Sequence, residues 1–143
     1  MSDNFGAATA ALLENYGQRV PHSGAMGHRI VEASPGRALL CQPWKPELLG
    51  DAERGLIHTS VQLTLVDATF GVAVFCALGV QESIATLDLR MDYYRPAVAG
   101  HDIYAEALVQ RVSRQIVFVQ GRLWQEDGEG DTAVARASFM RAA

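Results

Sequence analysis

An almost uninterrupted apolar run extends from Val61 to Leu78 and contains no Pro, Lys, Arg or Glu. Its β-branched residues would suit a strand, but its length without a turn signal favours a helix. Thr59 or Ser60 is expected to cap the first turn, and Gly79 is expected to end the helix. Because the run is apolar on nearly every face, we expect this helix to be buried.

Shorter elements flank this central helix. Ser2 or Asp3 can cap a helix whose apolar side chains recur at helical spacing, and a Ser-Pro-Gly turn between two apolar runs signals a hairpin. Further along, polar and apolar residues alternate between Thr86 and Tyr93, so this strand should bury one face. The predicted elements are a helix at residues 4–16, strands at 27–33 and 37–43, a loop at 44–56, and strands at 86–93, 103–112, 116–126 and 132–140.

The order of these elements predicts the α+β class, with helices on one side of an antiparallel sheet. The apolar face of such a sheet needs a cover, and the central helix is the obvious one. The 143 residues contain no internal repeat and no linker-like segment, so we expect a single domain over residues 1–143.

Composition and charge exclude several classes of partner. The chain is 49% hydrophobic and 20% charged, which is typical of a globular protein, and its two cysteines, Cys41 and Cys76, lie in apolar runs as expected of buried thiols. A net charge of -4 offers no basic surface for nucleic acid. Asp67 inside the apolar run argues against a membrane span, and no secretory signal is visible, so a cytoplasmic location is the default.

Asp67 is the residue of the central run with the most evident chemistry. A carboxylate in an apolar helix is neutral, paired or kept for chemistry, and structural pairing and catalysis both remain open. His58 precedes the helix and is either a hydrogen-bonded structural residue or a catalyst. The helix N-terminus at Thr59 and Ser60 presents N–H donors that can polarise a carbonyl. The four histidines are scattered without ligand spacing, so neither a metal nor another cofactor is expected.

The spacing of Thr59 and Asp67 limits how they can act together. They are eight residues apart in the sequence, which on one helix is about 12 Å along the axis. One ester or thioester carbonyl cannot contact both ends of that distance. If both serve one reaction they come from two chains, and a two-fold dimer with antiparallel helices would bring them together twice.

The spacing of His58 and Asp67 in an apolar helix, followed by the strand end Asp-Tyr-Tyr-Arg-Pro-Ala at residues 92–97, resembles the hotdog-fold acyl-CoA thioesterases of the phenylacetate-pathway (PaaI-like) type. The resemblance extends from about Gly27 to Phe139 and includes the hairpin at residues 36–38 and the loop at 46–51. It implies a hotdog fold, in which an antiparallel sheet of about six strands wraps a long central helix. It also implies dimers that pair their sheets edge to edge, with sites at the interface.

The resemblance assigns roles to individual residues. It implies that Asp67 acts as general base on water or as nucleophile toward the thioester carbonyl. Thr59 falls on the position of a glycine whose backbone N–H binds the thioester oxygen. The N–H that acts at each site would come from the central helix of the partner chain. Thr86 falls on a strand position near the reacting water.

The remaining candidates bind substrate or mark a departure from the family. Ser60 adjoins the proposed oxyanion site, and Arg95 and Arg114 are candidates for the phosphates of CoA. Where the family usually has His-Gly-Gly, this chain has His58-Thr59-Ser60. The backbone N–H survives this change, but the added β-carbons can crowd the carbonyl or alter the backbone angles.

The resemblance implies a thioesterase that hydrolyses an acyl-CoA, or an acyl carrier protein thioester, to the free acid and thiol. CoA would be part of the substrate, no cofactor would be needed, and no membrane would be involved. The alternative is an acyl-CoA binding or sensing module without activity. A hotdog hydratase would need a differently placed Asp and His pair. The acyl group, and the choice between a homodimer and a tetramer built as a dimer of dimers, remain open.

Overall fold

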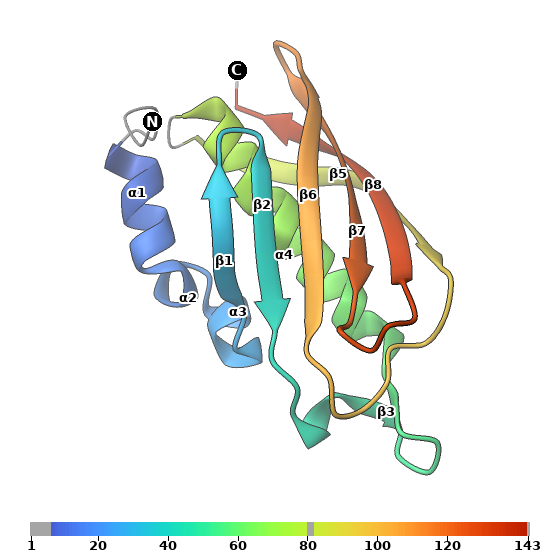
Figure 1. Ribbon diagram of the computed structural model, residues 1–143. Coiled ribbons are helices and arrows are strands. Elements are labelled where there is room, and N and C mark those ends of the chain that lie inside the picture. The colour runs from blue at the N-terminus through green and yellow to red at the C-terminus, as the bar shows by residue number, and fades with distance from the viewer. Residues whose placement is uncertain (1–6, 80–81, 143) are drawn as a thin grey trace.

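The computed structural model describes residues 7–79 and 82–142, in which a 20-residue helix packs against a six-stranded sheet. Three short helices come first, followed by a hairpin, a small two-stranded sheet, the long helix α4 and four further strands (Figure 1). The elements are α1 (Ala7–Glu14), α2 (Tyr16–Arg19), α3 (Pro21–Met26), β1 (Arg29–Ser34), β2 (Arg37–Gln42), the 3-10 helix η2 (Pro46–Leu48), β3 (Leu49–Asp51), β4 (Leu56–Ile57), α4 (Thr59–Leu78), β5 (Ile84–Tyr93), β6 (Ile103–Val112), β7 (Ile116–Trp124) and β8 (Asp131–Arg141).

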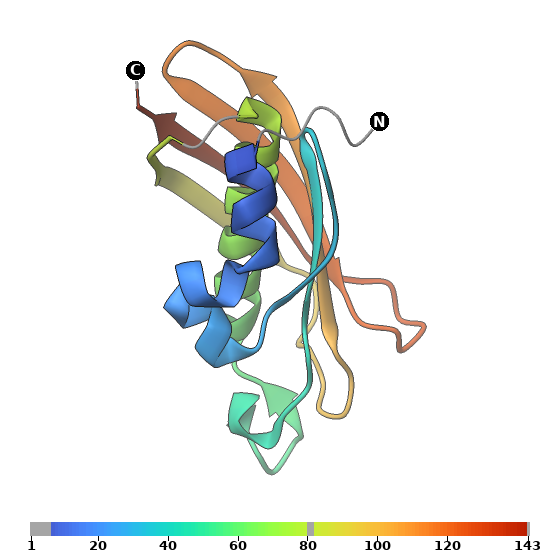
Figure 2. The ribbon, with the colours of Figure 1, turned by 90° about the vertical axis from the view of Figure 1, so that its left-hand side faces the viewer.

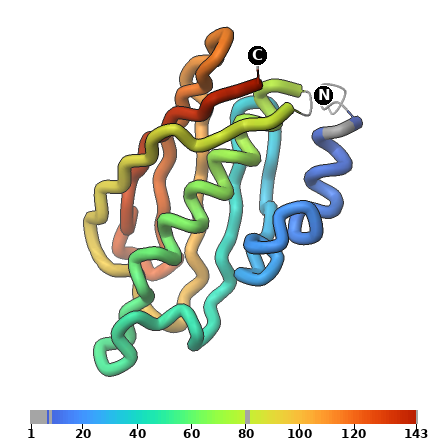
Figure 3. The backbone as a smooth tube through the Cα atoms, turned by 180° about the vertical axis from the view of Figure 1, so that it is seen from behind, coloured from blue at the N-terminus to red at the C-terminus, as the bar shows by residue number. Residues whose placement is uncertain are grey.

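The large sheet has the strand order β1-β2-β6-β7-β8-β5, and every neighbouring pair is antiparallel. Helix α4 lies against one face of this sheet, as the view from behind shows (Figure 3), and α1–α3 lie on the same side of the sheet (Figure 2). The predicted α+β class, the central helix and the six-stranded antiparallel sheet are therefore confirmed. β1, β2 and β5–β8 all lie where strands were predicted.

The core forms between α4 and the inward side chains of the sheet. Leu65, Val66 and Phe70 of α4 are fully buried. They meet sheet positions occupied by small residues, and a Cβ built on Gly121 would lie 2.7 Å from Cε1 of Phe70. Both cysteines are buried as predicted, and burial raises the pKa of the Cys76 thiol to about 11.

The start of α4 differs from the prediction, whereas its end agrees. The N-cap is His58, not Thr59 or Ser60: its backbone is extended and its side chain accepts a hydrogen bond from the Ser60 N–H, while Thr59 and Ser60 are already helical. Gly79 ends the helix in the left-handed conformation, at φ 67, and donates its N–H to the carbonyl of Phe75.

The prediction that α4 is buried on all sides is wrong for one stripe. Leu63 is 41% exposed, and Asp67 is also exposed. The reason is that the sheet covers one side of α4 and the described residues of this chain leave part of the other side open. By length and composition α4 could cross a membrane, but more than half of it is buried here, as in a core helix.

The N-terminal region is more helical than predicted. The expected helix at residues 4–16 is present as α1, although its proposed caps, Ser2 and Asp3, lie outside the described residues. Helices α2 and α3 were not predicted. They cross where Gly17 and Gly24 meet, since a Cβ on Gly24 would lie 2.3 Å from the Gly17 carbonyl oxygen. This contact between two short segments has no periodic signature in the sequence.

Two further expectations need correction. The segment predicted as a loop at 44–56 contains the 3-10 helix η2, the strand β3 and the start of β4; β3 and β4 pair as a small antiparallel sheet, with Leu49 opposite Ile57. Strand β5 was predicted to bury one face, but most of its residues are exposed, including Leu87 at 48% and Tyr93 at 43%. β5 is the edge of the sheet, so nothing described in this chain packs beyond it.

Candidate functional site

Asp67 and Thr86, two of the predicted site residues, lie together. Asp67 projects from the exposed stripe of α4, and its Oδ1 accepts a hydrogen bond of 2.8 Å from Oγ1 of Thr86 on the edge strand β5. One carboxylate oxygen is thus held by a hydroxyl group. The expectation of a buried carboxylate is wrong for a single chain, because Asp67 is exposed there.

A groove of about 510 Å³ opens at Asp67 between α4, β5 and the N-terminal helices. Residues of α4 and β5 form one side of the groove, and residues of α2, α3 and the connection between them form the other. The lining residues are Tyr16, Val20, His22, Ser23, Leu63, Thr64, Asp67, Ala68, Thr86 and Leu89. Sequence reasoning missed Tyr16 and Ser23, because no motif or periodicity connects the N-terminal segment with α4.

His58 organises the N-terminus of α4. Its Nδ1 lies 3.1 Å from the Ser60 nitrogen and 2.7 Å from Ser60 Oγ. Since Nδ1 accepts the backbone N–H, the neutral ring carries its proton on Nε2. Gly50 packs against this residue, where a Cβ would lie 2.9 Å from the His58 Cα. His58, Thr59 and Ser60 are all exposed.

The first turn of α4 retains one backbone donor. The Ser60 N–H is bound by Nδ1 of His58, and the Val61 N–H by the His58 carbonyl at 3.0 Å. Among the described residues, the Thr59 N–H has no hydrogen-bond partner. The free N–H of a helix N-terminus carries partial positive charge and can stabilise an oxyanion.

The two parts of the candidate site are separate within one chain. Asp67 and Thr86 form one cluster, while Thr59 belongs to another, in which its carbonyl accepts a hydrogen bond of 3.3 Å from the Tyr93 hydroxyl. Both clusters contact β5, near opposite ends of that strand. A single chain therefore does not bring the helix N-terminus to the carboxylate.

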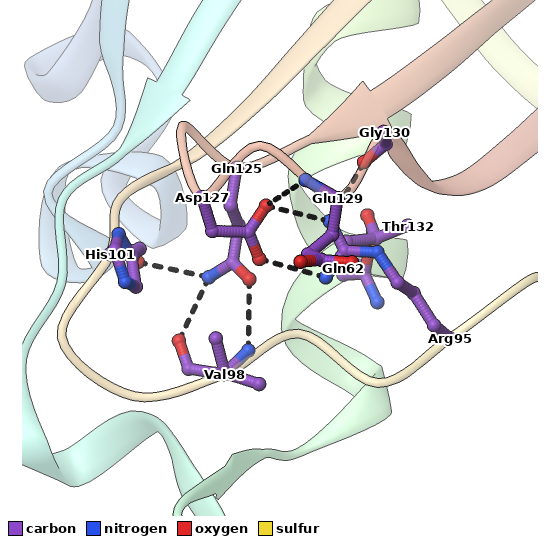
Figure 4. Close-up of polar contacts among 9 residues, drawn as sticks. All are labelled: Gln62, Arg95, Val98, His101, Gln125, Asp127, Glu129, Gly130 and Thr132. Atoms are coloured by element: carbon purple, nitrogen blue, oxygen red, sulfur yellow. Dashed lines mark hydrogen bonds and ion pairs between the residues drawn. The ribbon is translucent and has the colours of Figure 1, made fainter.

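Arg95, predicted to bind a CoA phosphate, is held inside the chain. Its guanidinium makes two hydrogen bonds of 2.9 Å to Asp127 and one of 2.7 Å to the Gly130 carbonyl (Figure 4). This pairing lowers the pKa of the Asp127 carboxyl. Arg95 thus fastens the β5–β6 connection to the β7–β8 turn, and a role at CoA stays a prediction. Arg114 is exposed in the β6–β7 turn, where its role is also a prediction.

Two buried glutamines strengthen the same region. Gln125 binds the β5–β6 connection by accepting from the Val98 N–H and donating to the carbonyls of Val98 and His101 (Figure 4). Gln62 of α4 accepts a hydrogen bond from the Thr132 hydroxyl at the start of β8. Because the Thr132 carbonyl also accepts the Tyr94 N–H, Gln62 ties α4 to the backbone that follows β5. Within residues 7–79 and 82–142, no three His, Cys, Asp or Glu side chains are grouped to hold a metal.

Comparison with known proteins points to one family. The model of the thioesterase superfamily matches residues 54–141. A Halobacterium salinarum protein provisionally named as an esterase is 33% identical over 110 residues, which is 75% of this chain and 72% of that protein. A crystal structure from Pseudomonas aeruginosa is 29% identical with a TM-score of 0.81, covering 94% of this chain and 99% of the other. A point mutant of the phenylacetic acid degradation protein PaaI from Thermus thermophilus is 25% identical with a TM-score of 0.75, covering 85% and 99%.

Proposed function

The chain belongs to the thioesterase superfamily, and we propose that it hydrolyses an acyl-CoA thioester to the free acid and CoA. The observation that carries this proposal is the Asp67–Thr86 pair, which lines a groove between α4 and the edge strand β5. A carboxylate with one oxygen held by a hydroxyl keeps its other oxygen for a substrate water. Such a positioned base typically accelerates a reaction by about 10²–10⁴-fold.

We propose that the site is completed by a second copy of the chain. If two β5 strands pair antiparallel about a two-fold axis near Leu89, the Thr86 end of one strand lies level with the Tyr93 end of the other. Since Tyr93 binds the Thr59 carbonyl, the partner's helix N-terminus then comes to Asp67. The exposed stripe of α4 would be covered by the same contact.

The charges on β5 support a pairing of this kind. Asp88, Arg90 and Asp92 alternate on the outer face of the strand, opposite outward residues of β8. With Leu89 opposite its counterpart, Asp88 of each strand lies opposite Arg90 of the other. Opposite charges across an antiparallel pair contribute about 0.2–1 kcal/mol each.

The reaction follows from these positions. The thioester carbonyl oxygen accepts the Thr59 N–H of one chain, which stabilises the negative charge that develops when water attacks. Asp67 of the other chain takes a proton from that water as the new C–O bond forms. The C–S bond then breaks, and the leaving thiolate receives this proton, which restores the Asp67 carboxylate. Because Thr59 and Ser60 are exposed, their side chains lie outside the core, and the backbone donor stays available in place of the family's glycine. Attack by Asp67 itself is the alternative route.

The first test is thiol release from a panel of aromatic and aliphatic acyl-CoA esters by the parent protein and the Asp67→Asn variant. We expect kcat to fall by at least about 10²-fold in the variant. Glu126→Gln removes one exposed carboxylate elsewhere and is the matched control. Equal rates for parent and Asp67→Asn would refute the role of Asp67. If the parent releases no thiol from any ester of the panel while CoA esters still raise its Tm, the result would favour a binding module.

The two-chain site is tested by complementation. Thr59 is the first helical residue, where proline is well tolerated, and the preceding His58 has the extended backbone that proline requires. Thr59→Pro therefore deletes the N–H without breaking α4. Co-expression of Thr59→Pro with Asp67→Asn should restore about a quarter of the parent activity, because half the dimers are mixed and each holds one intact site. A site within one chain would give no recovery.

A further inference from the structure

A chain of buried polar side chains leads from the core to the groove at Asp67. The Tyr16 hydroxyl lies 3.1 Å from Ser23 Oγ, and Ser23 Oγ lies 3.0 Å from Nδ1 of His28. Tyr16 and His28 are each 8% exposed and Ser23 is 2% exposed. Tyr16 and Ser23 also line the groove. The mechanism above uses none of these groups.

The contacts of His28 at the buried end of this hydrogen-bonded row determine which group donates in each of its hydrogen bonds. Gln42 donates its amide NH₂ to the carbonyls of Met26 and Pro43, so the amide cannot be flipped and Oε1 must accept. Within the described residues, Gln42 Oε1 and His28 Nε2 are both buried without a partner in hydrogen-bond geometry. Gln42 acts on the His28 ring as a hydrogen-bonding side chain, so the two groups are neighbours, and an Nε2–H donated to Oε1 would satisfy both.

The protonation state of His28 agrees with this assignment. Burial lowers its pKa to about 4, and the weaker influence of Gln42 opposes that lowering. The ring is therefore neutral at pH 7, with one N–H and one acceptor. With the proton on Nε2, the Nδ1 atom accepts from the Ser23 hydroxyl, and Ser23 Oγ accepts from the Tyr16 hydroxyl.

Tyr16 consequently presents an oxygen that accepts but does not donate. Burial raises the pKa of Tyr16, and the nearby Asp67 charge adds to it, so the hydroxyl stays protonated at neutral pH. Its only proton is given to Ser23. Tyr16 lines a groove whose other walls combine the apolar Leu63, Ala68 and Leu89 with Asp67 and two threonines, and the effect of Asp67 on the Tyr16 hydroxyl places the two groups near each other. A buried acceptor in such surroundings favours a ligand that brings a donor.

We propose that Tyr16 is a specificity-determining residue, whose hydroxyl oxygen accepts a hydrogen bond from a hydroxyl group on the acyl part of the substrate. This inference rests on the proposed thioesterase function and adds its substrate class, small hydroxyacyl thioesters. Tyr16, Ser23 and His28 all precede residues 54–141, the segment that the superfamily model matches. In this proposal the N-terminal helices determine the acyl-group specificity, whereas the matched segment contains the catalytic residues.

The test compares butyryl-CoA with its 2-, 3- and 4-hydroxy derivatives in the parent, in Tyr16→Phe and in Tyr104→Phe, which removes a tyrosine hydroxyl outside the groove. The measured quantity is the hydroxy-to-deoxy ratio of kcat/KM on each protein. For at least one derivative, we expect a ratio of about ten or more in the parent and in Tyr104→Phe, falling to about one in Tyr16→Phe. A purely structural role for Tyr16 would lower both rates and leave the ratio unchanged.

A separate experiment tests whether Tyr16 donates to Ser23 and Ser23 donates to His28. Ser23→Ala frees the Tyr16 proton, so the groove can then donate to a carbonyl. The parent should prefer 3-hydroxybutyryl-CoA to acetoacetyl-CoA, and Ser23→Ala should lose that preference. Nitrogen-15 NMR of the parent should show His28 protonated on Nε2 at pH 7. A proton on Nδ1 would overturn the assignment.

The outcomes separate this inference from the proposed function. Hydrolysis of butyryl-CoA with no preference for any hydroxylated derivative would overturn the inference and leave the thioesterase proposal standing. If none of the esters is hydrolysed, the proposed function fails. The role of Tyr16 is then tested by the rise in Tm that each ester causes. The hydroxylated esters must then raise Tm more than butyryl-CoA in the parent and not in Tyr16→Phe, or the inference fails too.

Discussion

Lowering the pH should destabilise the protein through His28. The ring is buried, and burial, followed by the charges of His22 and Lys45, lowers its pKa from 6.5 to about 4, against a smaller opposing effect of Gln42. Between these values the unfolded chain binds a proton that the folded chain does not. Stability from this group is therefore fully present above about pH 6.5 and is lost as the pH falls toward 4.

The size of the effect follows from the two pKa values. At about 1.36 kcal/mol per pKa unit, the difference between 6.5 and about 4 amounts to about 3 kcal/mol in the free energy of unfolding. About 2 kcal/mol of this should already be lost at pH 5, because the unfolded histidine is almost fully charged there while the folded one is still mostly neutral.

Urea unfolding at pH 7.5 and pH 5 measures the effect when the parent is compared with His28→Gln, which cannot titrate. The advantage of the parent over the variant should shrink by about 2 kcal/mol at the lower pH, and other titrating groups cancel in this difference. His101→Gln, at an exposed histidine, controls for the loss of a ring. An advantage that is the same at both pH values would show that His28 is not held neutral by the fold.

Two glycine substitutions probe close contacts around the candidate site. In Gly121→Ala the new carbon would clash with the backbone carbonyl of Glu106 and lie 2.7 Å from Cε1 of Phe70, so the free energy of unfolding should fall by about 1–3 kcal/mol or more in urea titrations. An unchanged value would mean that both neighbours can give way at no cost. In Gly50→Ala the carbon would lie 3.1 Å from Cδ2 of His58, so loss of the cap should cost about 1 kcal/mol and kcat on the best acyl-CoA ester should fall. A variant with parental Tm and parental kcat would contradict the tight packing of Gly50 against His58.

Periodicity was sufficient to predict the strands and the central helix, but it could not predict what covers them. Leu63, in the helix that was expected to be buried, and Leu87, in the strand that was expected to bury one face, are 41% and 48% exposed. A sequence shows that a side chain is apolar, and it does not show whether its cover comes from the same chain. Both errors fall on the α4 and β5 face, which our proposal covers with a second copy.

The candidate site was predictable only where its residues lie in the family's motif. The spacing of Thr59 and Asp67 predicted that one carbonyl cannot contact both ends of one helix, and in the structure Asp67 contacts Thr86 whereas Thr59 contacts Tyr93. By contrast, the contribution of Tyr16 depends on the crossing of α2 and α3 and on contacts across long sequence separations. Helices of four and six residues leave almost no periodic signal.

The replacement of a glycine pair by Thr59 and Ser60 can now be judged by the fate of each backbone donor. His58 binds the N–H groups of Ser60 and Val61 through its ring and its carbonyl. The donor that remains belongs to Thr59, and it would remain with any side chain except proline. Glycine would add room, and the exposed side chains of Thr59 and Ser60 already extend away from the core. The Thr59-Ser60 pair should therefore leave the oxyanion donor in place and mainly affect how closely the helix of a second chain approaches Asp67. The activity of Thr59→Gly relative to the parent measures this effect.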